Sequence, residues 1–215
     1  MSARAHRDTP ASAIFISHIE MMLLPWWAWA LIVLVILGVA VGMWMWVSQM
    51  ISSNGPKGVV PVPIVLDEYA GKWYEVARLE NWFETGCTAV TAEYAANADG
   101  SVAVTNTCFK SGGVGEPNVA NGRAVLNANG TLSVAFPAAF PISYGNYTCV
   151  YRADDAAGRW QTSAVVNSDL AMAWILDRRA QVPVADFDAA RAALAAAGVN
   201  VDKLVHIIQP FRAER

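Results

Sequence analysis

Charged residues are missing from a long stretch near the N-terminus. The 215-residue chain has no Asp, Glu, Lys or Arg between Glu20 and Lys57, and within that gap the segment from Trp26 to Trp46 is almost wholly apolar. About 20 residues at roughly 1.5 Å each extend about 30 Å, the thickness of a bilayer's hydrocarbon core. The absence of charge therefore predicts a transmembrane helix within residues 21–50, preceded by a tail at 1–20.

A small-residue cleavage site is also missing after this segment, because Val47-Ser48-Gln49-Met50 offers none. A signal peptide has a shorter apolar region, roughly 7 to 15 residues, and ends at such a site, so we expect an uncleaved anchor. Tryptophans at both ends of the segment favour a membrane span over a buried soluble helix, because they match the aromatic belts at the two water interfaces. They are Trp26, Trp27, Trp29, Trp44 and Trp46.

Cations near the span are few. Arg4 and Arg7 precede it, and Lys57 is the only one close behind it. The positive-inside rule then favours a cytoplasmic N-terminus and a translocated C-terminal part. Because α-helical anchors normally reside in the inner membrane, the expected location is a single-pass inner-membrane protein with its domain in the periplasm.

Residues that hold metals or perform catalysis are sparse. The histidines are His6, His18 and His206, at spacings unlike a metal site, and no Gly-x-Ser-x-Gly, phosphate-loop or dinucleotide motif occurs. From Ile64 onward acidic residues outnumber basic ones, with no basic run, which disfavours nucleic acid as a partner. We expect no cofactor and no metal. The oligomeric state stays open.

Turn residues divide the C-terminal part into short apolar-rich stretches at nearly regular spacing, as in antiparallel barrels. The eight predicted strands are Gly71 to Glu80, Cys87 to Ala95, Ser101 to Lys110, Val119 to Leu126, Thr131 to Phe136, Tyr144 to Arg152, Trp160 to Val166 and Met172 to Arg178. Eight strands close around room for one small ligand. The predicted fold is therefore all-β, an eight-stranded antiparallel up-and-down barrel.

One helix and a short extended segment follow the strands. Val184 to Ala197 has apolar residues at helical spacing, with Pro183 before it and Gly198 after it, and Val205 to Gln209 is extended. The Pro- and Gly-containing residues 51–63 predict a semi-rigid linker. The predicted order is therefore tail, membrane anchor, linker and a barrel domain over residues 64–212.

Only three cysteines occur: Cys87, Cys108 and Cys149. If the strands around Asn97-Ala98-Asp99-Gly100 form a hairpin with Tyr94 facing Ser101, Cys87 lies opposite Cys108, close enough for a disulfide. Such a bond persists in an oxidising compartment; the alternative is two unbridged cysteines. Cys149 is then either a small buried hydrophobe or a reactive thiol.

Three segments resemble sequence blocks of the lipocalin family, in its bacterial, apolipoprotein D-like branch. They are Leu66 to Arg78 with the loop Asn81 to Cys87, Gly145-Asn146-Tyr147, and Trp174 to Arg178. The resemblance covers about residues 64 to 210. It implies a ligand-binding barrel that begins at Gly71, in which Arg178 covers Trp73 at the closed end.

The chain departs from this branch in one respect. Bacterial members are typically anchored through an acylated cysteine just after the signal, whereas the first cysteine here is Cys87. We therefore expect the N-terminal helix to replace the lipid anchor.

Candidate ligand-binding residues are a carboxylate and aromatics near the predicted mouth. Glu75 could point into the barrel, as a ligand anchor or in a structural hydrogen bond. The aromatics could line a cavity or merely pack in loops. They are Trp82, Phe83, Tyr94, Phe109, Phe136, Phe140 and Tyr144, with Val125 and Trp160 as weaker candidates for the wall.

The function hypothesis is a membrane-tethered lipocalin that binds apolar small molecules such as fatty acids or lysophospholipids. It is not expected to be an enzyme. An interaction module with a filled barrel is the first alternative. An isomerase using Cys149 as its nucleophile and a carrier of a pigment such as haem or a bilin are the others.

Overall fold

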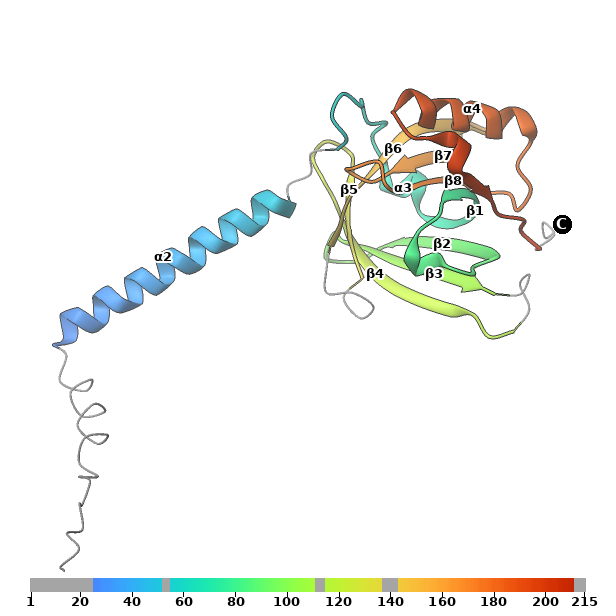
Figure 1. Ribbon diagram of the computed structural model, residues 1–215. Helices are drawn as coiled ribbons and strands as arrows, with labels where there is room; N and C mark the ends of the chain where they lie inside the picture. The colour runs from blue at the N-terminus through green and yellow to red at the C-terminus, as the bar shows by residue number, and fades with distance from the viewer. Residues whose placement is uncertain (1–24, 52–54, 111–114, 137–142, 211–215) are drawn as a thin grey trace, which may run out of the picture. The chain divides into compact units, whose positions relative to one another are not determined.

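The computed structural model describes the backbone of residues 25–51, 55–110, 115–136 and 143–210, and the side chains of these residues except 44–51 and 143–145. The chain divides into two compact units, Met1–Met50 and Ile51–Arg215 (Figure 1). The buried apolar clusters consist of residues from the second unit, so that unit carries its own core.

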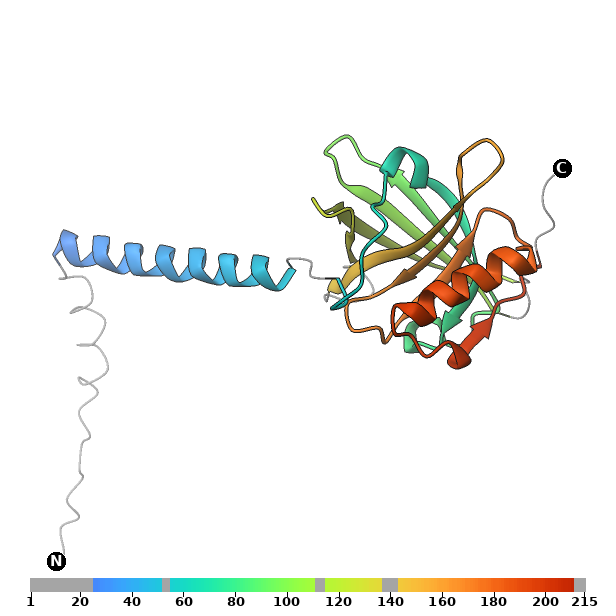
Figure 2. The ribbon, with the colours of Figure 1, turned by 90° about the horizontal axis from the view of Figure 1, so that it is seen from above.

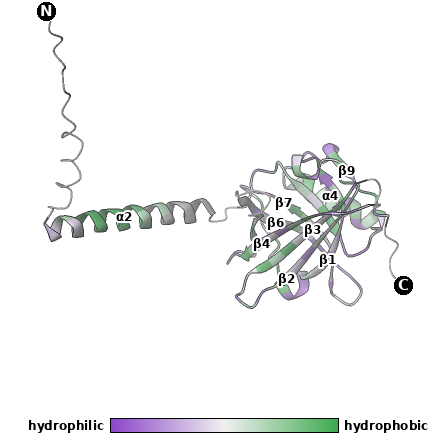
Figure 3. Cartoon of the chain, turned by 90° about the horizontal axis from the view of Figure 1, so that it is seen from below, coloured by the Kyte–Doolittle hydropathy of each residue, from purple (hydrophilic) through white to green (hydrophobic). Residues whose placement is uncertain are grey.

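The first unit contains helix α2 (Trp26–Ile51), whose described side chains are mostly exposed. Its window Trp26–Met43 is long and apolar enough to cross a bilayer, although a signal sequence near an N-terminus would satisfy the same criteria. Figure 3 colours most of its described turns green, the colour of hydrophobic residues, and no charged residue occurs in the helix. An exposed helix that is apolar on every side is what a lipid environment accommodates.

The second unit is a closed antiparallel barrel, as predicted (Figure 2). Strands β1 to β8 follow one another around it, and β2 pairs again with β1 to close the ring. The strands are β1 (Gly71–Leu79), β2 (Ala89–Ala96), β3 (Val102–Phe109), β4 (Asn118–Leu126), β5 (Leu132–Ala135), β6 (Ser143–Asp154), β7 (Trp160–Val166) and β8 (Ala173–Asp177).

The predicted pairing of the β2–β3 hairpin was wrong, although its disulfide is confirmed. Tyr94 faces Val104 rather than Ser101. The turn is shorter than expected, because the ladder continues to Ala96 opposite Val102 and Asn97 donates its backbone N–H to the Ser101 carbonyl. Within the turn, the Asp99 carboxylate accepts from Ser101. Cys87 therefore precedes β2 instead of lying within it. The bond to Cys108 ties the loop after β1 to β3, with 5.4 Å between the Cα atoms.

An aromatic cluster closes one end of the barrel. The short helix α3 (Leu66–Tyr69) places Tyr69 against Trp73 and Trp160, at ring-centroid distances of 4.7 and 4.9 Å. The guanidinium of Arg178 lies 3.7 Å from the Trp73 ring centroid and donates to the carbonyls of residues 68, 69, 70 and 72. Gly71 has a φ of +95° at the turn between α3 and β1, where glycine is favoured.

Helix α4 (Val184–Ala196) packs on the outside of the barrel against β6, β7 and β8 (Figure 2). Phe187 and Leu194 pack against side chains on the outer face of the sheet and form a second hydrophobic core with them. The extended segment returns to the sheet as β9 (Leu204–His206), after the 3₁₀ turn η3 (Val201–Lys203), and pairs with β1.

A register shift in β1 interrupts its alternation. The shift against β8 falls between Glu75 and Ala77. As a result Glu75 faces the cavity, whereas Ala77 joins the outer core with α4, although strict alternation along the strand would place both side chains on the same face. Beyond the shift, Arg78 is buried and reaches back to Glu75. The irregularity thus brings two charged side chains together.

Candidate functional site

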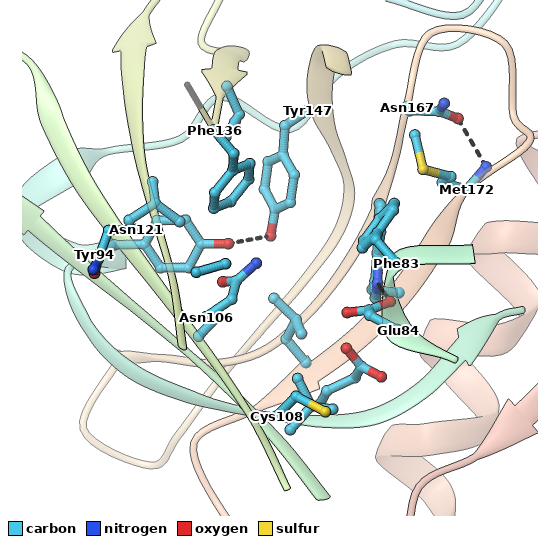
Figure 4. Close-up of a pocket in the computed structure, with 18 of the residues that line it drawn as sticks. Phe83, Glu84, Tyr94, Asn106, Cys108, Asn121, Phe136, Tyr147, Asn167 and Met172 are labelled. Carbon is cyan, nitrogen blue, oxygen red and sulfur yellow. Dashed lines mark hydrogen bonds between the residues drawn. The ribbon is translucent and has the colours of Figure 1, made fainter. Parts of the chain in front are cut away.

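The barrel encloses a cavity of about 580 Å³, within the range of small-molecule binding sites. Its wall comes from strands β1 to β6 and β8, from the 3₁₀ turn η2 (Trp82–Glu84) and from the turn between β7 and β8. Figure 4 shows Tyr94, Asn106 and Phe136 on one side and Phe83, Glu84 and Met172 on the other. The lining is mostly apolar with a few polar groups, as in many ligand sites.

Five of the predicted ligand-binding residues line this cavity: Glu75, Trp82, Phe83, Tyr94 and Phe136. Phe109 does not, because Asn106 and Cys108 face inward and the alternation of β3 turns Phe109 outward. Phe140 lies outside the described residues, as does the side chain of Tyr144.

The two weaker candidates for the wall are also absent from it. Val125 is exposed on β4, and Trp160 belongs to the core at the closed end. Both were misplaced because the direction of a side chain in a strand depends on register, which one sequence does not reveal.

Glycine makes room for one of the aromatic walls. A Cβ added to Gly122 on β4 would lie 2.6 Å from the Phe136 ring and 2.8 Å from the carbonyl oxygen of Ala135. No real side chain tolerates such distances. The absence of a side chain at Gly122 therefore lets Phe136 lie flat against β4 as part of the cavity wall.

Three tyrosine hydroxyls meet where the cavity approaches the closed end. Tyr94 donates to the Tyr147 hydroxyl at 3.1 Å, and the hydroxyls of Tyr69 and Tyr147 lie 2.8 Å apart. Burial raises the pKa of Tyr94 to about 12 and raises that of Tyr147 as well. These groups are neutral at physiological pH, so they present hydrogen-bonding capacity without charge.

A cluster of three charged side chains lies at the wall beside η2. Glu75, Arg78 and Glu84 are 3%, 2% and 7% exposed. Arg78 donates to Glu75 Oε1 at 2.8 Å and to the carbonyl oxygens of Glu84 and Cys87. Its Nε has no hydrogen-bond partner in the described structure and lies 3.8 Å from Glu84 Oε2.

Electrostatics within this cluster favour a protonated Glu75. Burial and the neighbouring Glu84 carboxylate raise the pKa of Glu75 well above its usual range, and the Arg78 guanidinium offsets this only in part. The Glu84 carboxylate also accepts from the Trp174 indole N–H at 3.2 Å and from the Asn81 amide. The cluster is therefore held from β1, η2 and β8.

Several lining residues were not predicted as site residues, among them Glu84, Asn106, Tyr147, Met172 and Trp174. Tyr147 and Trp174 lie within the sequence blocks that carry the family resemblance, but the blocks do not say which side chains face inward. Glu84 is in the loop after the first block, where only the aromatics were considered. A glutamate in a loop is normally exposed to solvent, so nothing in the sequence indicated that Glu84 lies at the cavity wall.

Cys149 is fully buried and does not line the cavity. Its Sγ lies 3.1 Å from the Tyr151 carbonyl oxygen and 3.4 Å from the Ser163 hydroxyl. Burial raises the pKa of its thiol to about 11, so the thiolate needed for nucleophilic attack is scarce at neutral pH. These properties are those of a small buried hydrophobe.

Comparisons with known proteins agree with this architecture. Residues 64–209 match the family described as the Lipocalin-like domain. The outer membrane lipoprotein Blc of Vibrio cholerae is 33% identical over 158 residues, which cover 72% of this chain and 88% of Blc. Blc of Escherichia coli K12 is 29% identical over 164 residues, covering 74% and 88%.

Solved structures share the fold. The cockroach allergen Per a 4 superposes with a TM-score of 0.55 at 18% identity, over 73% of this chain and 96% of that one. Insecticyanin from the tobacco hornworm Manduca sexta gives 0.51 at 16% identity, over 73% and 91%.

The relatives contradict the expected location in the inner membrane. Several are outer membrane lipoproteins by name, so the prediction of a single-pass inner-membrane protein is wrong. It rested on the length and apolarity of α2, and these establish only that a helix can cross a bilayer. They do not specify which membrane holds the protein.

The family match, the relatives and the closed barrel support binding of a small apolar molecule in the cavity. The recognition from sequence is also confirmed, since residues 64–209 and the Blc proteins lead to the same assignment. The chain belongs to the lipocalin family.

Proposed function

We propose that this protein binds single-chain lipids, such as fatty acids or lysophospholipids, and stores or carries them beside a membrane. The observation that carries the proposal is the largely apolar cavity of about 580 Å³ inside the closed barrel. Burial of an acyl chain against Val90, Val104, Val134 and Leu176 would supply most of the affinity, at about 0.8 kcal/mol per buried methylene.

The proposal includes a tether through α2. That helix is exposed and apolar on every side, and Trp26, Trp27 and Trp29 lie in its first turns. Anchoring would keep the barrel in a region rich in lipid and so raise the effective ligand concentration.

Native mass spectrometry and lipid extraction test the binding. The unit Ile51–Arg215 carries its own core and can be produced separately, in an oxidising compartment so that the disulfide forms. We expect a single-chain lipid to copurify at about one per chain, or a fluorescent single-chain lipid to be taken up with that stoichiometry. A cooperatively unfolding protein that contains no lipid and takes up none would contradict the proposal.

Two other functions are less well supported. An interaction module requires a filled barrel, whereas this barrel is hollow. A thiol-dependent isomerase requires a reactive Cys149, whereas that thiol is buried with a raised pKa.

Thiol labelling tests the isomerase directly. We expect Cys149 in the native protein to resist a mild alkylating reagent at neutral pH and to react after unfolding in urea, because burial both shields the thiol and suppresses the thiolate. Rapid labelling of the native protein, accompanied by loss of a measurable turnover, would favour the enzyme.

A further inference from the structure

The cavity wall carries an imbalance of charge. Glu75 and Glu84 both line it, and no Lys, Arg or His from the described part of the chain does so. Behind the wall, Arg78 is the cation that contacts both carboxylates. Two acidic groups therefore share one guanidinium, and when both are ionised the buried cluster has one negative charge in excess.

Such an excess is costly because these side chains are buried and a buried charge needs a partner. A proton on Glu75 can neutralise it when the cavity holds no charged ligand. A cation delivered by the ligand can do the same, since both carboxyl groups form part of the cavity surface. The ligand cation would then complete the ion-pair network that Arg78 leaves incomplete.

An independent feature of the opposite wall also calls for a hydrogen-bond donor. The amide oxygen of Asn106 on β3 is buried and has no hydrogen-bond partner among the residues that the structure describes. Figure 4 shows Asn106 and Glu84 on opposite sides of the cavity. A buried acceptor without a donor costs stability unless a ligand supplies one.

Aromatic rings accompany these acceptors. Trp174 donates to Glu84, and Trp82 and Phe83 line the cavity from η2, where Glu84 also lies. The faces of aromatic rings attract cations, most strongly where water is excluded. Carboxylates, an unpartnered amide oxygen and aromatic faces all select for a positively charged donor.

We propose that this cavity selects amphiphiles with a cationic amine head group, which lies between Glu75, Glu84 and Asn106 while the acyl chain fills the apolar part. The inference rests on the proposed lipid binding and narrows its ligand class. It places fatty-acid carboxylates lowest in affinity, because the described lining offers them no cation and two carboxyl groups to repel them.

Three ligands with the same tail test the selectivity. The ligands are dodecylamine, dodecanol and dodecanoic acid. Each competes for a bound neutral fluorescent probe on the unit Ile51–Arg215, at neutral pH and at concentrations at which the ligand is monomeric in solution. We expect the amine to bind at least about tenfold more tightly than the alcohol, and the alcohol more tightly than the acid.

Variants assign the selectivity to the carboxylates. Glu84→Gln keeps an oxygen to accept from Trp174 but removes the charge, and should lower affinity for the amine by about tenfold while leaving the alcohol unchanged. Glu75→Gln provides a second test if Glu84→Gln fails to unfold cooperatively. Glu93→Gln, an exposed position on β2, is the matched control and should change nothing.

The outcomes separate the two proposals. Equal affinity for all three ligands, or tighter binding of the acid, would overturn amine selectivity while lipid binding stands. Selectivity that survives both Glu84→Gln and Glu75→Gln would overturn its assignment to this cluster. A folded protein that takes up neither the probe nor any of the three ligands would overturn the selectivity together with the proposed function.

Discussion

At the residue scale, a few charged side chains are buried or partly buried, and the contacts of each one explain what it does. Arg178 joins α3 to β1 and β8 by stacking on Trp73 and donating to several carbonyls. Glu75 and Arg78 place charge at the cavity wall, where the register shift in β1 directs both toward Glu84. The closed end is thereby stabilised by a cation, while the cavity retains a titratable carboxyl group.

Replacing Arg178 by alanine should destabilise the barrel strongly. The change removes the cation–π contact and the hydrogen bonds to the carbonyl groups of residues 68, 69, 70 and 72, some of them partly buried, so we expect a loss of roughly 2–4 kcal/mol in the free energy of unfolding. Urea denaturation measures it. Arg191→Ala, which removes an exposed ion pair with Asp202, is the control and should cost less than about 1 kcal/mol.

Glu75 should make stability depend on pH. Because its pKa is raised in the folded state, the folded protein retains a proton that the unfolded chain has released once the pH exceeds the ordinary glutamate value of about 4.3. The contribution of Glu75 is therefore complete below that value and declines as pH rises through the raised pKa.

Thermal unfolding across this range checks the prediction. Glu75→Gln should flatten the decline with rising pH, whereas Glu93→Gln should retain it. An unchanged decline in Glu75→Gln would mean that another group titrates, with Glu84, Arg78 and Tyr94 as the charged or titratable neighbours.

At the scale of elements, the segment between β1 and β2 contributes most to the site. It contains η2, with Trp82, Phe83 and Glu84, and ends at Cys87, whose disulfide joins it to β3. The Cys87 carbonyl also accepts from Arg78. The covalent bond thus positions a part of the cavity wall that has little regular structure of its own.

Loss of the disulfide should weaken both stability and the cavity. A cross-link that closes a loop of about 20 residues contributes roughly 3 kcal/mol by restricting the unfolded chain. The Cys87→Ser/Cys108→Ser variant should therefore unfold at lower urea concentration than the oxidised wild type and bind lipid more weakly.

Reducing agent provides the control. The wild type should approach the variant when reduced, and the variant should not respond. If reduction leaves the wild-type midpoint unchanged, the cross-link does not contribute to stability.

At the scale of the whole molecule, the chain combines an apolar helix with a self-sufficient barrel. Described residues of α2 remain exposed, and the barrel core needs none of them. In our proposal the two units therefore have different functions: α2 attaches the protein to a membrane, and the barrel binds the ligand.

Lysines in the middle of α2 should abolish membrane attachment. Each lysine at the centre of a span costs about 2.5–3.5 kcal/mol. The Leu34→Lys/Leu37→Lys chain should therefore lose flotation with liposomes while its barrel still unfolds cooperatively and binds lipid. Leu34→Ala/Leu37→Ala should float like the wild type. Flotation of the lysine variant would show that attachment does not depend on α2.

Sequence patterns by themselves determined the architecture of this protein. The length of the uncharged N-terminal segment predicts α2, and the regular spacing of turn residues predicts eight strands. The sequence blocks around Trp73 and Trp174 carry the family resemblance. These features are local, and the hydrophobic and turn preferences that produce them are readable along the chain. The Cys87–Cys108 disulfide was also predicted, although through a register that places Cys87 within β2, whereas Cys87 precedes that strand and Cys108 faces Val90.

Tertiary structure alone decided which side chains meet inside the barrel. The direction of each side chain depends on strand register and on the shift in β1, and moving by one residue reverses it. For that reason Phe109 was placed inside incorrectly, while Glu84, Asn106 and Tyr147 were overlooked. The charge imbalance of the cavity exists only because β1 and η2 bring Glu75, Arg78 and Glu84 together. Asn106 joins them at the cavity only because β3 forms the opposite wall.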